Sequence, residues 1–122
     1  MNENKITIAS DNQQVLSKLQ ITLQEKGYEI NSFTDGLQAL NNIRKEHPQV
    51  LVLSDSLSKV GGLMLCRLLK FDRRYEDLII ILLISRANTA DKEIANDLGA
   101  DAFFVEPYEL DKLSEKIVSL MN

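Results

Sequence analysis

The sequence predicts an α/β fold of three layers, in which a doubly wound parallel sheet of five strands, in the order 2-1-3-4-5, lies between two layers of helices. Short runs of aliphatic and β-branched residues alternate along the chain with segments whose apolar residues recur every three or four positions. Such alternation favours parallel strands joined by right-handed helical crossovers. The run at 78–84 is seven residues long and wholly aliphatic, which predicts a central strand covered on both faces.

Five pairs of a strand and a helix account for almost the whole chain. The predicted strands are residues 5–9, 28–33, 50–54, 78–84 and 102–105. The predicted helices are residues 13–26, 36–45, 62–71, 90–98 and 109–121. Gly27 and Gly99 follow two of these helices, as glycine often does at a helix end. We expect Leu37 in the second helix and Ile94 in the fourth to face the sheet.

The composition excludes several classes of function. The chain has 122 residues, and we expect one domain over 1–122. Its 14 basic and 18 acidic residues give a formal net charge of −4, without the basic surplus that direct nucleic-acid binding needs. The one cysteine, Cys66, can form no internal disulfide and is expected in the core. Because no segment is long and apolar enough for a membrane span or a signal peptide, we expect a cytoplasmic protein without membrane contact.

The candidate functional residues follow the predicted strands. In a doubly wound sheet the site lies beyond the carboxyl ends of the strands, where the winding reverses. For the predicted order this reversal falls between the first and third strands, which would bring Asp11 near Ser54 and Asp55. The same edge carries the ends of the fourth and fifth strands, at Ile84, Ser85 and Glu106.

Short motifs along the chain resemble those of a known family. They are residues 5–8 (KITI), 25–29 (EKGYE), 35–40 (DGLQAL), 62–66 (GLMLC) and 99–101 (GAD). Together they resemble the CheY-like receiver domain of two-component response regulators, which has a flavodoxin-like architecture. The resemblance runs from Lys5 to about Ile117 without insertion or deletion. It is anchored on Pro48, Gly62, Asp72, Gly99 and Pro107.

The resemblance implies a phosphorylation site that this sequence has largely lost. In the family, two acidic residues after the first strand hold Mg²⁺, and an aspartate after the third takes a phosphoryl group from a histidine kinase. A hydroxyl residue after the fourth strand and a lysine after the fifth bind the phosphoryl oxygens. The aligned residues here are Ser10 and Asp11, Ser54, Ile84 and Glu106. The sequence therefore predicts a degenerate pseudo-receiver, a signal-transduction module that is not an enzyme and uses no cofactor.

A phosphorylatable receiver is the alternative. Asp55 and Ser85 each follow the expected acceptor and hydroxyl positions by one residue, so one extra residue in each strand would restore both groups. Asp11 and Asp55 would then be ligands of Mg²⁺. A shift of one residue turns a side chain to the other face, so each strand would need a bulge. Glu106 would still replace the lysine.

The resemblance also implies an interaction surface on the fourth helix, the fifth strand and the fifth helix, where the family makes dimer or effector contacts. Here this surface would include Lys92, Asn96, Phe103, Tyr108, Lys112 and Lys116. We expect the partners to be other signalling proteins or further domains of a longer parent chain, and a homodimer is a further option. By the same resemblance, the peptide bond before Pro107 should be cis.

Overall fold

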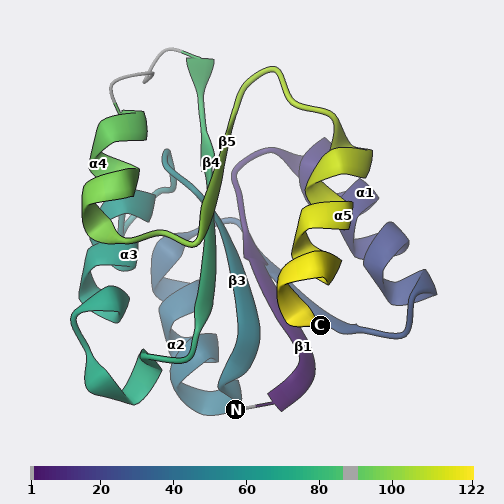
Figure 1. Ribbon diagram of the computed structural model, residues 1–122, viewed down its shortest axis with the longest axis horizontal. Coiled ribbons are helices and arrows are strands. Elements are labelled where there is room, and N and C mark those ends of the chain that lie inside the picture. Colours follow the sequence, from purple (N-terminus) through teal and green to yellow (C-terminus); the bar gives the residue numbers. More distant parts are fainter. Residues whose placement is uncertain (1, 87–90) are drawn as a thin grey trace.

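The computed structural model describes residues 2–86 and 91–122, which form a sheet of five parallel strands in the order β2-β1-β3-β4-β5 (Figure 1). The strands are β1 (Asn2–Ala9), β2 (Glu29–Phe33), β3 (Pro48–Ser54), β4 (Ile79–Ile84) and β5 (Ala102–Val105). The helices are α1 (Gln13–Glu25), α2 (Gly36–Glu46), α3 (Gly62–Lys70), the 3-10 helix η1 (Arg73–Tyr75), α4 (Asp91–Leu98) and α5 (Leu110–Met121). The predicted fold class is confirmed. None of these described helices is long and apolar enough to cross a membrane.

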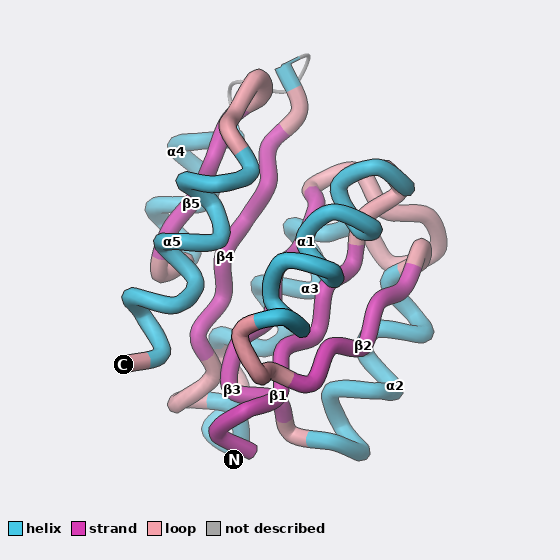
Figure 2. The backbone as a smooth tube through the Cα atoms, turned by 90° about the vertical axis from the view of Figure 1, so that its right-hand side faces the viewer, coloured by secondary structure: helices cyan, strands magenta, loops and turns pink. Residues whose placement is uncertain are grey.

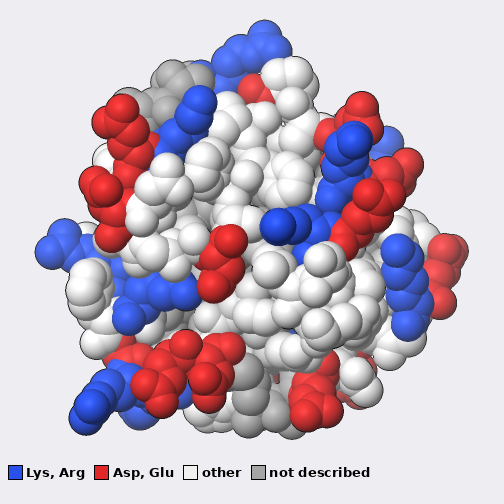
Figure 3. All heavy atoms as spheres, viewed as in Figure 1, with Lys and Arg blue, Asp and Glu red and all other residues white. Residues whose placement is uncertain are grey.

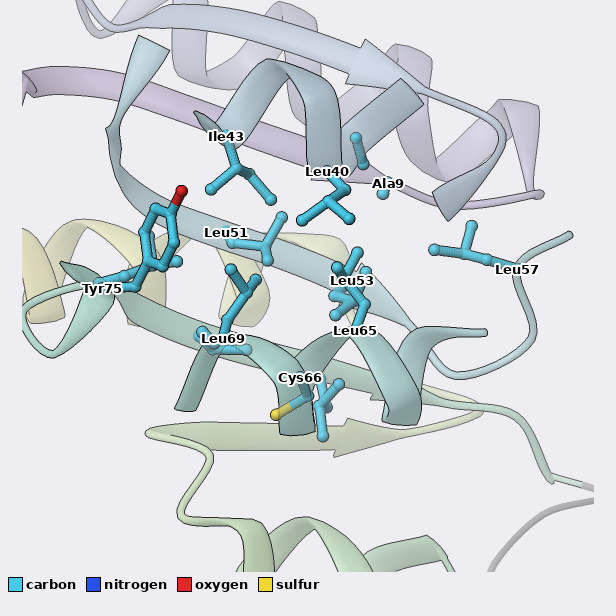
Figure 4. Close-up of a cluster of buried hydrophobic side chains, with 14 of the residues drawn as sticks. Ala9, Leu40, Ile43, Leu51, Leu53, Leu57, Leu65, Cys66, Leu69 and Tyr75 are labelled. Carbon is cyan, nitrogen blue, oxygen red and sulfur yellow. The ribbon is translucent and has the colours of Figure 1, made fainter. Parts of the chain in front are cut away.

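Helices cover both faces of the sheet (Figures 1 and 2). On one face, Val50 and Val52 of β3 pack with residues of α1 and α5. On the other, Leu51 and Leu53 pack with residues of α2, α3 and α4. Figure 4 shows this second cluster, in which side chains of α2 and α3 meet those of β3. Cys66 is fully buried within it, as predicted.

Two strands begin earlier than predicted. β1 starts at Asn2 and not at residue 5, and β3 starts at Pro48 and not at residue 50. Asn2 pairs with Pro48, and the register then shifts before Ile6. Proline suits the first position of a strand because it has no N–H to donate. Since this pairing depends on a distant segment, the polar residues at the start of β1 carry no local signal for it.

The other predicted boundaries agree with the structure within one residue. The predicted start of the fourth helix at residue 90 lies outside the described residues. The helix η1 was not predicted, because three residues are too few to show a helical period.

The prediction that Leu37 and Ile94 face the sheet is wrong, because each side chain is 44% exposed. In α2 the buried residues are Gly36, Ala39, Leu40 and Ile43. The centre of this buried stripe therefore lies about one position before the centre expected from Leu37. In α4 the fully buried residue is Ala95. Ile94 precedes it by one position, which is a rotation of about 100° around the helix.

Close backbone contacts position the loops at the carboxyl edge of the sheet. Gly62 opens α3 against the end of β3, where an added Cβ would lie 1.8 Å from the carbonyl oxygen of Ser54. Gly36 opens α2 in the same way, 1.9 Å from the carbonyl oxygen of Val60. Both helices therefore begin where only glycine leaves room for the neighbouring backbone. The peptide bond between Glu106 and Pro107 is cis, as predicted.

Candidate functional site

The end of β1 is organised by hydrogen bonds within the chain. Ser10 is 2% exposed, and its Oγ accepts a hydrogen bond of 3.1 Å from the backbone N–H of Asn12. Asn12 caps α1, because its side-chain oxygen accepts from the backbone N–H groups of Gln14 and Val15. Asp11 lies between these residues and is exposed. Ser10 therefore closes a turn, and Asp11 supplies the carboxylate at this strand end.

β3 ends at Ser54, and the next residue, Asp55, contacts the loop after β4. Ser54 is 7% exposed and lies opposite Leu83, at the last position of a register that runs from Val50 without a shift. The backbone N–H of Asp55 donates to the carbonyl of Leu83 at 2.8 Å. Each carboxylate oxygen of Asp55 lies 3.3 Å from the backbone nitrogen of Ser85. The fold therefore brings Asp55 and Ser85 together. The paired residues of β3 and β4 contain no bulge, which the phosphorylatable alternative would need.

Ile84 and Glu106 complete the same edge at β4 and β5. Ile84 is fully buried and packs in the cluster under α2, α3 and α4, so its side chain offers no polar group. Glu106 is exposed, and its backbone N–H donates to the carbonyl of Ile84 at 2.9 Å. The positions predicted to correspond to the family's hydroxyl and lysine thus carry an apolar side chain and a carboxylate.

Tyr108 lies close to the negative charge of this edge. Its half-buried ring contacts Phe104 edge-on, with ring centroids 6.3 Å apart. Burial, together with three nearby carboxylates, raises the pKa of Tyr108 to about 12. In decreasing order of effect, these carboxylates are Glu106, Asp11 and Asp55. The sequence carried no signal for this arrangement, because it joins three separate loops.

Asp11 and Asp55, the residues named as ligands under the Mg²⁺ alternative, lie at the same edge of the sheet. Among the side chains that the structure describes, in residues 3–86 and 92–122, no three histidine, cysteine, aspartate or glutamate side chains are grouped so that they could hold a metal ion. A hollow of about 400 Å³ lies beside the edge, between the start of α1 and the segment that leads into α5. It is lined by Asn12, Gln14, Val15, Lys18, Arg86, Glu106, Pro107, Tyr108 and Leu110.

The predicted interaction face consists of α4, β5 and α5, which lie side by side in Figure 1. Its predicted lysines and asparagine are exposed: Lys92, Asn96, Lys112 and Lys116. Phe103 and Tyr108 are half-buried. Figure 3 views this side and shows mostly uncharged atoms over the centre, with charged side chains along the helices on both flanks.

Sequence reasoning missed Phe104 on this face. Phe103 packs on the side of α2, α3 and α4, whereas Phe104 packs on the side of α1 and α5. Phe104 also lines a hollow of about 350 Å³ with Lys112, Glu115, Lys116 and Ser119. Adjacent residues of a strand point to opposite faces, so only the structure decides which aromatic ring lies beside α5.

Comparison with known proteins identifies the family. The family model described as the response regulator receiver domain matches residues 6–118. The chain belongs to the response-regulator receiver family. This receiver domain is 32% identical over 122 residues to a probable transcriptional regulator, ycf27, of Cyanophora paradoxa, covering 100% of this chain and 50% of the relative. It is 29% identical over 118 residues to the response regulator MprA of Mycobacterium leprae, covering 97% of this chain and 51% of the relative. The chain thus spans about half the length of the curated relatives it matches.

Solved structures share the fold of this receiver domain. A putative response regulator from Chloroflexus aurantiacus superimposes with a TM-score of 0.87 at 24% identity, covering 97% of both chains. A DNA-binding response regulator of the LuxR family from Staphylococcus aureus gives a TM-score of 0.85 at 20% identity, covering 98% of this chain and 99% of that one. Receiver domains of response regulators are signal-transduction modules that interact with signalling partners.

Proposed function

We propose that this receiver domain signals as a protein-interaction module and does not take up a phosphoryl group. The observation that carries this proposal is the unshifted register of β3 on β4, in which Ser54 is the last paired residue. In the gapless resemblance to the family, Ser54 stands at the position of the acceptor aspartate. A serine hydroxyl needs a base hydrogen-bonded to it to become a nucleophile, and within the residues that the structure describes no hydrogen bond joins the Ser54 hydroxyl to a base.

The donor groups at the edge also argue against Mg²⁺. This ion requires an octahedron of oxygen ligands and in receivers is bound by clustered carboxylates. Ser10 uses its hydroxyl to accept from the backbone, and Ile84 has no donor or acceptor in its side chain. Glu106 carries a carboxylate at the lysine position, but no three histidine, cysteine, aspartate or glutamate side chains among the described residues are grouped so that they could hold a metal ion. The residues present do not fit the ion, and we propose that the domain works without it.

A second candidate function is phosphorylation of Asp55. One observation favours it: the Asp55 carboxylate lies at the carboxyl edge, with both oxygens 3.3 Å from the backbone nitrogen of Ser85. Against it, Asp55 follows β3 without the bulge that would bring it to the acceptor position. The charge of Glu106 would also repel a phosphoryl group there.

Intact mass spectrometry after incubation with acetyl phosphate and Mg²⁺ separates the two candidates. We expect the wild-type mass to stay unchanged. The matched positive control is a variant with the four family residues, Ser10→Asp, Ser54→Asp, Ile84→Thr and Glu106→Lys, which should gain one phosphoryl group. A phosphoryl group on the wild type that disappears in Asp55→Asn would establish the second candidate instead.

We further propose that output passes through the face of α4, β5 and α5. Its mostly uncharged centre and its charged flanks, which include the exposed Lys92, Lys112 and Lys116, fit an interface with a charged rim (Figure 3). Reversing two rim charges, in Lys112→Glu with Lys116→Glu, should lower the signalling output of the full-length protein about fivefold or more. The control, Asp55→Asn, should leave this output unchanged. If Asp55→Asn lowered the output and the two lysine reversals left it unchanged, an output that is independent of phosphorylation would be excluded.

A further inference from the structure

α3 presents apolar side chains on both of its faces. Its inner residues fill the core beneath it, as Figure 4 shows for Leu65, Cys66 and Leu69. On the outer face, Met64, Leu68 and Phe71 are 55%, 51% and 75% exposed. The spacing of four and then three residues places them in one stripe along the helix. Single apolar residues are common on protein surfaces, but a continuous stripe marks an interaction site.

A groove of about 830 Å³ accompanies this stripe, and we call it the α3 groove. It is lined by Met64, Arg67, Leu68, Phe71, Asp72 and Arg73. These residues run from the first turn of α3 to the start of η1, along the helix that Figure 1 places at the edge of the molecule. The α3 groove shares no lining residue with the candidate site at the carboxyl edge or with the predicted interaction face of α4, β5 and α5.

The α3 groove carries uncompensated positive charge. Its carboxylate, Asp72, is already paired, because Nη2 of Arg74 lies 2.6 Å from its Oδ2 and the hydrogen bonds from Arg74 lower the pKa of Asp72. Arg67 and Arg73 form no ion pair with any residue that the structure describes. Figure 3 shows basic side chains at the left edge at the height of α3, with acidic side chains above and below them. This local positive charge contrasts with the formal net charge of −4 of the chain.

The positive charge of the groove disfavours two alternative partners, a second copy of the chain and an anionic membrane. In a two-fold dimer through α3, the same patch meets itself, so the interface would bury the arginines of both copies while the groove's own carboxylate, Asp72, is already paired with Arg74. An anionic membrane would attract the groove but repel a domain with a formal net charge of −4.

We propose that the α3 groove binds an acidic amphipathic helix of a partner protein. Apolar side chains of that helix cover Leu68 and Phe71, and its carboxylates pair with Arg67 and Arg73. This is the helix-in-groove mode of recognition, in which anchors recur every three or four residues. Methionine, aromatic residues and arginine, the types that line the groove, are the ones enriched at protein interfaces. The inference goes beyond the proposed function and does not depend on whether the domain is phosphorylated.

Two designed helical peptides test this proposal on the ¹⁵N-labelled chain. Both carry leucine at every third or fourth position, and the flanking positions are glutamate in one peptide and lysine in the other. We expect the glutamate peptide to shift the amides of α3 and η1 saturably and to bind at least about tenfold more tightly than the lysine peptide. In the double variant Arg67→Glu with Arg73→Glu, this preference should reverse.

Exposed apolar residues provide the matched variants. Phe71→Ser should weaken binding of the glutamate peptide about tenfold, whereas Ile21→Ser on α1, where Ile21 is 58% exposed, should not change it. Equal binding of the two peptides, or amide shifts outside α3 and η1, would overturn the proposal. So would self-association that Phe71→Ser abolishes, which would assign the groove to a second copy. Tighter binding to vesicles containing phosphatidylserine than to the glutamate peptide would assign it to a membrane.

Discussion

Replacing Gly62 by alanine should destabilise the domain, because Gly62 is where α3 approaches the end of β3 most closely. An added Cβ would lie 1.8 Å from the carbonyl oxygen of Ser54 and 2.9 Å from the Cα of Asp55. Cβ contacts shorter than 3.0 Å essentially do not occur, so the Ser54 oxygen must move by more than 1 Å relative to α3. Both neighbours are backbone atoms, so no side chain can rotate away to make room.

The magnitude follows from two opposing effects. Overpacking that forces a backbone shift costs about 1–3 kcal/mol. Alanine in place of glycine recovers up to about 1 kcal/mol at a helical position. We expect Gly62→Ala to lower the free energy of unfolding by about 1–2 kcal/mol, and the melting temperature by roughly 3–12 °C for a domain of this size.

Urea unfolding followed by circular dichroism is the appropriate assay. Gly62→Ala should lower the midpoint while leaving the denaturant slope unchanged. The adjacent Gly61 provides the control, because its φ is −63° and an added Cβ would meet nothing within 4 Å. Because Gly61 is the N-cap of α3, where glycine is preferred to alanine, Gly61→Ala should lower the free energy of unfolding by up to about 1 kcal/mol, less than Gly62→Ala. If Gly62→Ala were as stable as wild type, or if the two variants lost the same stability, the close approach at Ser54 would be refuted.

Three further outcomes can be measured directly. Burial raises the pKa of the Cys66 thiol to about 11, so iodoacetamide should alkylate Cys66 only on unfolding, and fast alkylation of the folded chain would contradict this. Because the folded pKa lies above the unfolded one, the contribution of the thiol to the free energy of unfolding should be lost as the pH rises from 9 through about 11. Absorbance titration should give Tyr108 a pKa of about 12. Glu106→Gln should lower this pKa but leave it above 10.0, because burial is a larger cause of the shift than the Glu106 charge. An unchanged pKa would mean that the Glu106 charge does not act on the phenol. Ser54→Asp alone should not become phosphorylated by acetyl phosphate while Ile84 and Glu106 remain, and a phosphoryl group on that single variant, seen by intact mass, would show that the other positions suffice.

The architecture could be predicted from sequence because each element carries its own local pattern. The seven aliphatic residues at 78–84 indicate a buried strand without reference to any other segment. Leu37 and Ile94 were misplaced because periodicity fixes the spacing of a stripe but only loosely its centre. In α2, the buried small residues Gly36 and Ala39 move the centre by one position. Apolar character alone could not show this.

The candidate site was only partly accessible to sequence reasoning. Strand order predicts that Asp11, Ser54 and Asp55 share an edge, and the structure places them there. The hydrogen bonds from the Ser85 backbone to Asp55, and the carboxylates around Tyr108, join segments far apart in the chain. Such contacts arise from the lengths and directions of loops, which leave no periodic signal in the sequence.

Titration of the ¹⁵N-labelled chain with Mg²⁺ and beryllofluoride tests the central claim most directly. Beryllofluoride with Mg²⁺ mimics the phosphoryl group on a receiver aspartate, so binding reports a competent acceptor and metal site together. Our account predicts no saturable amide shifts at the carboxyl edge of the sheet. Saturable shifts clustered at Asp11, Asp55 and Ser85 would show that the site binds the phosphoryl mimic, and would contradict a domain that signals without phosphorylation.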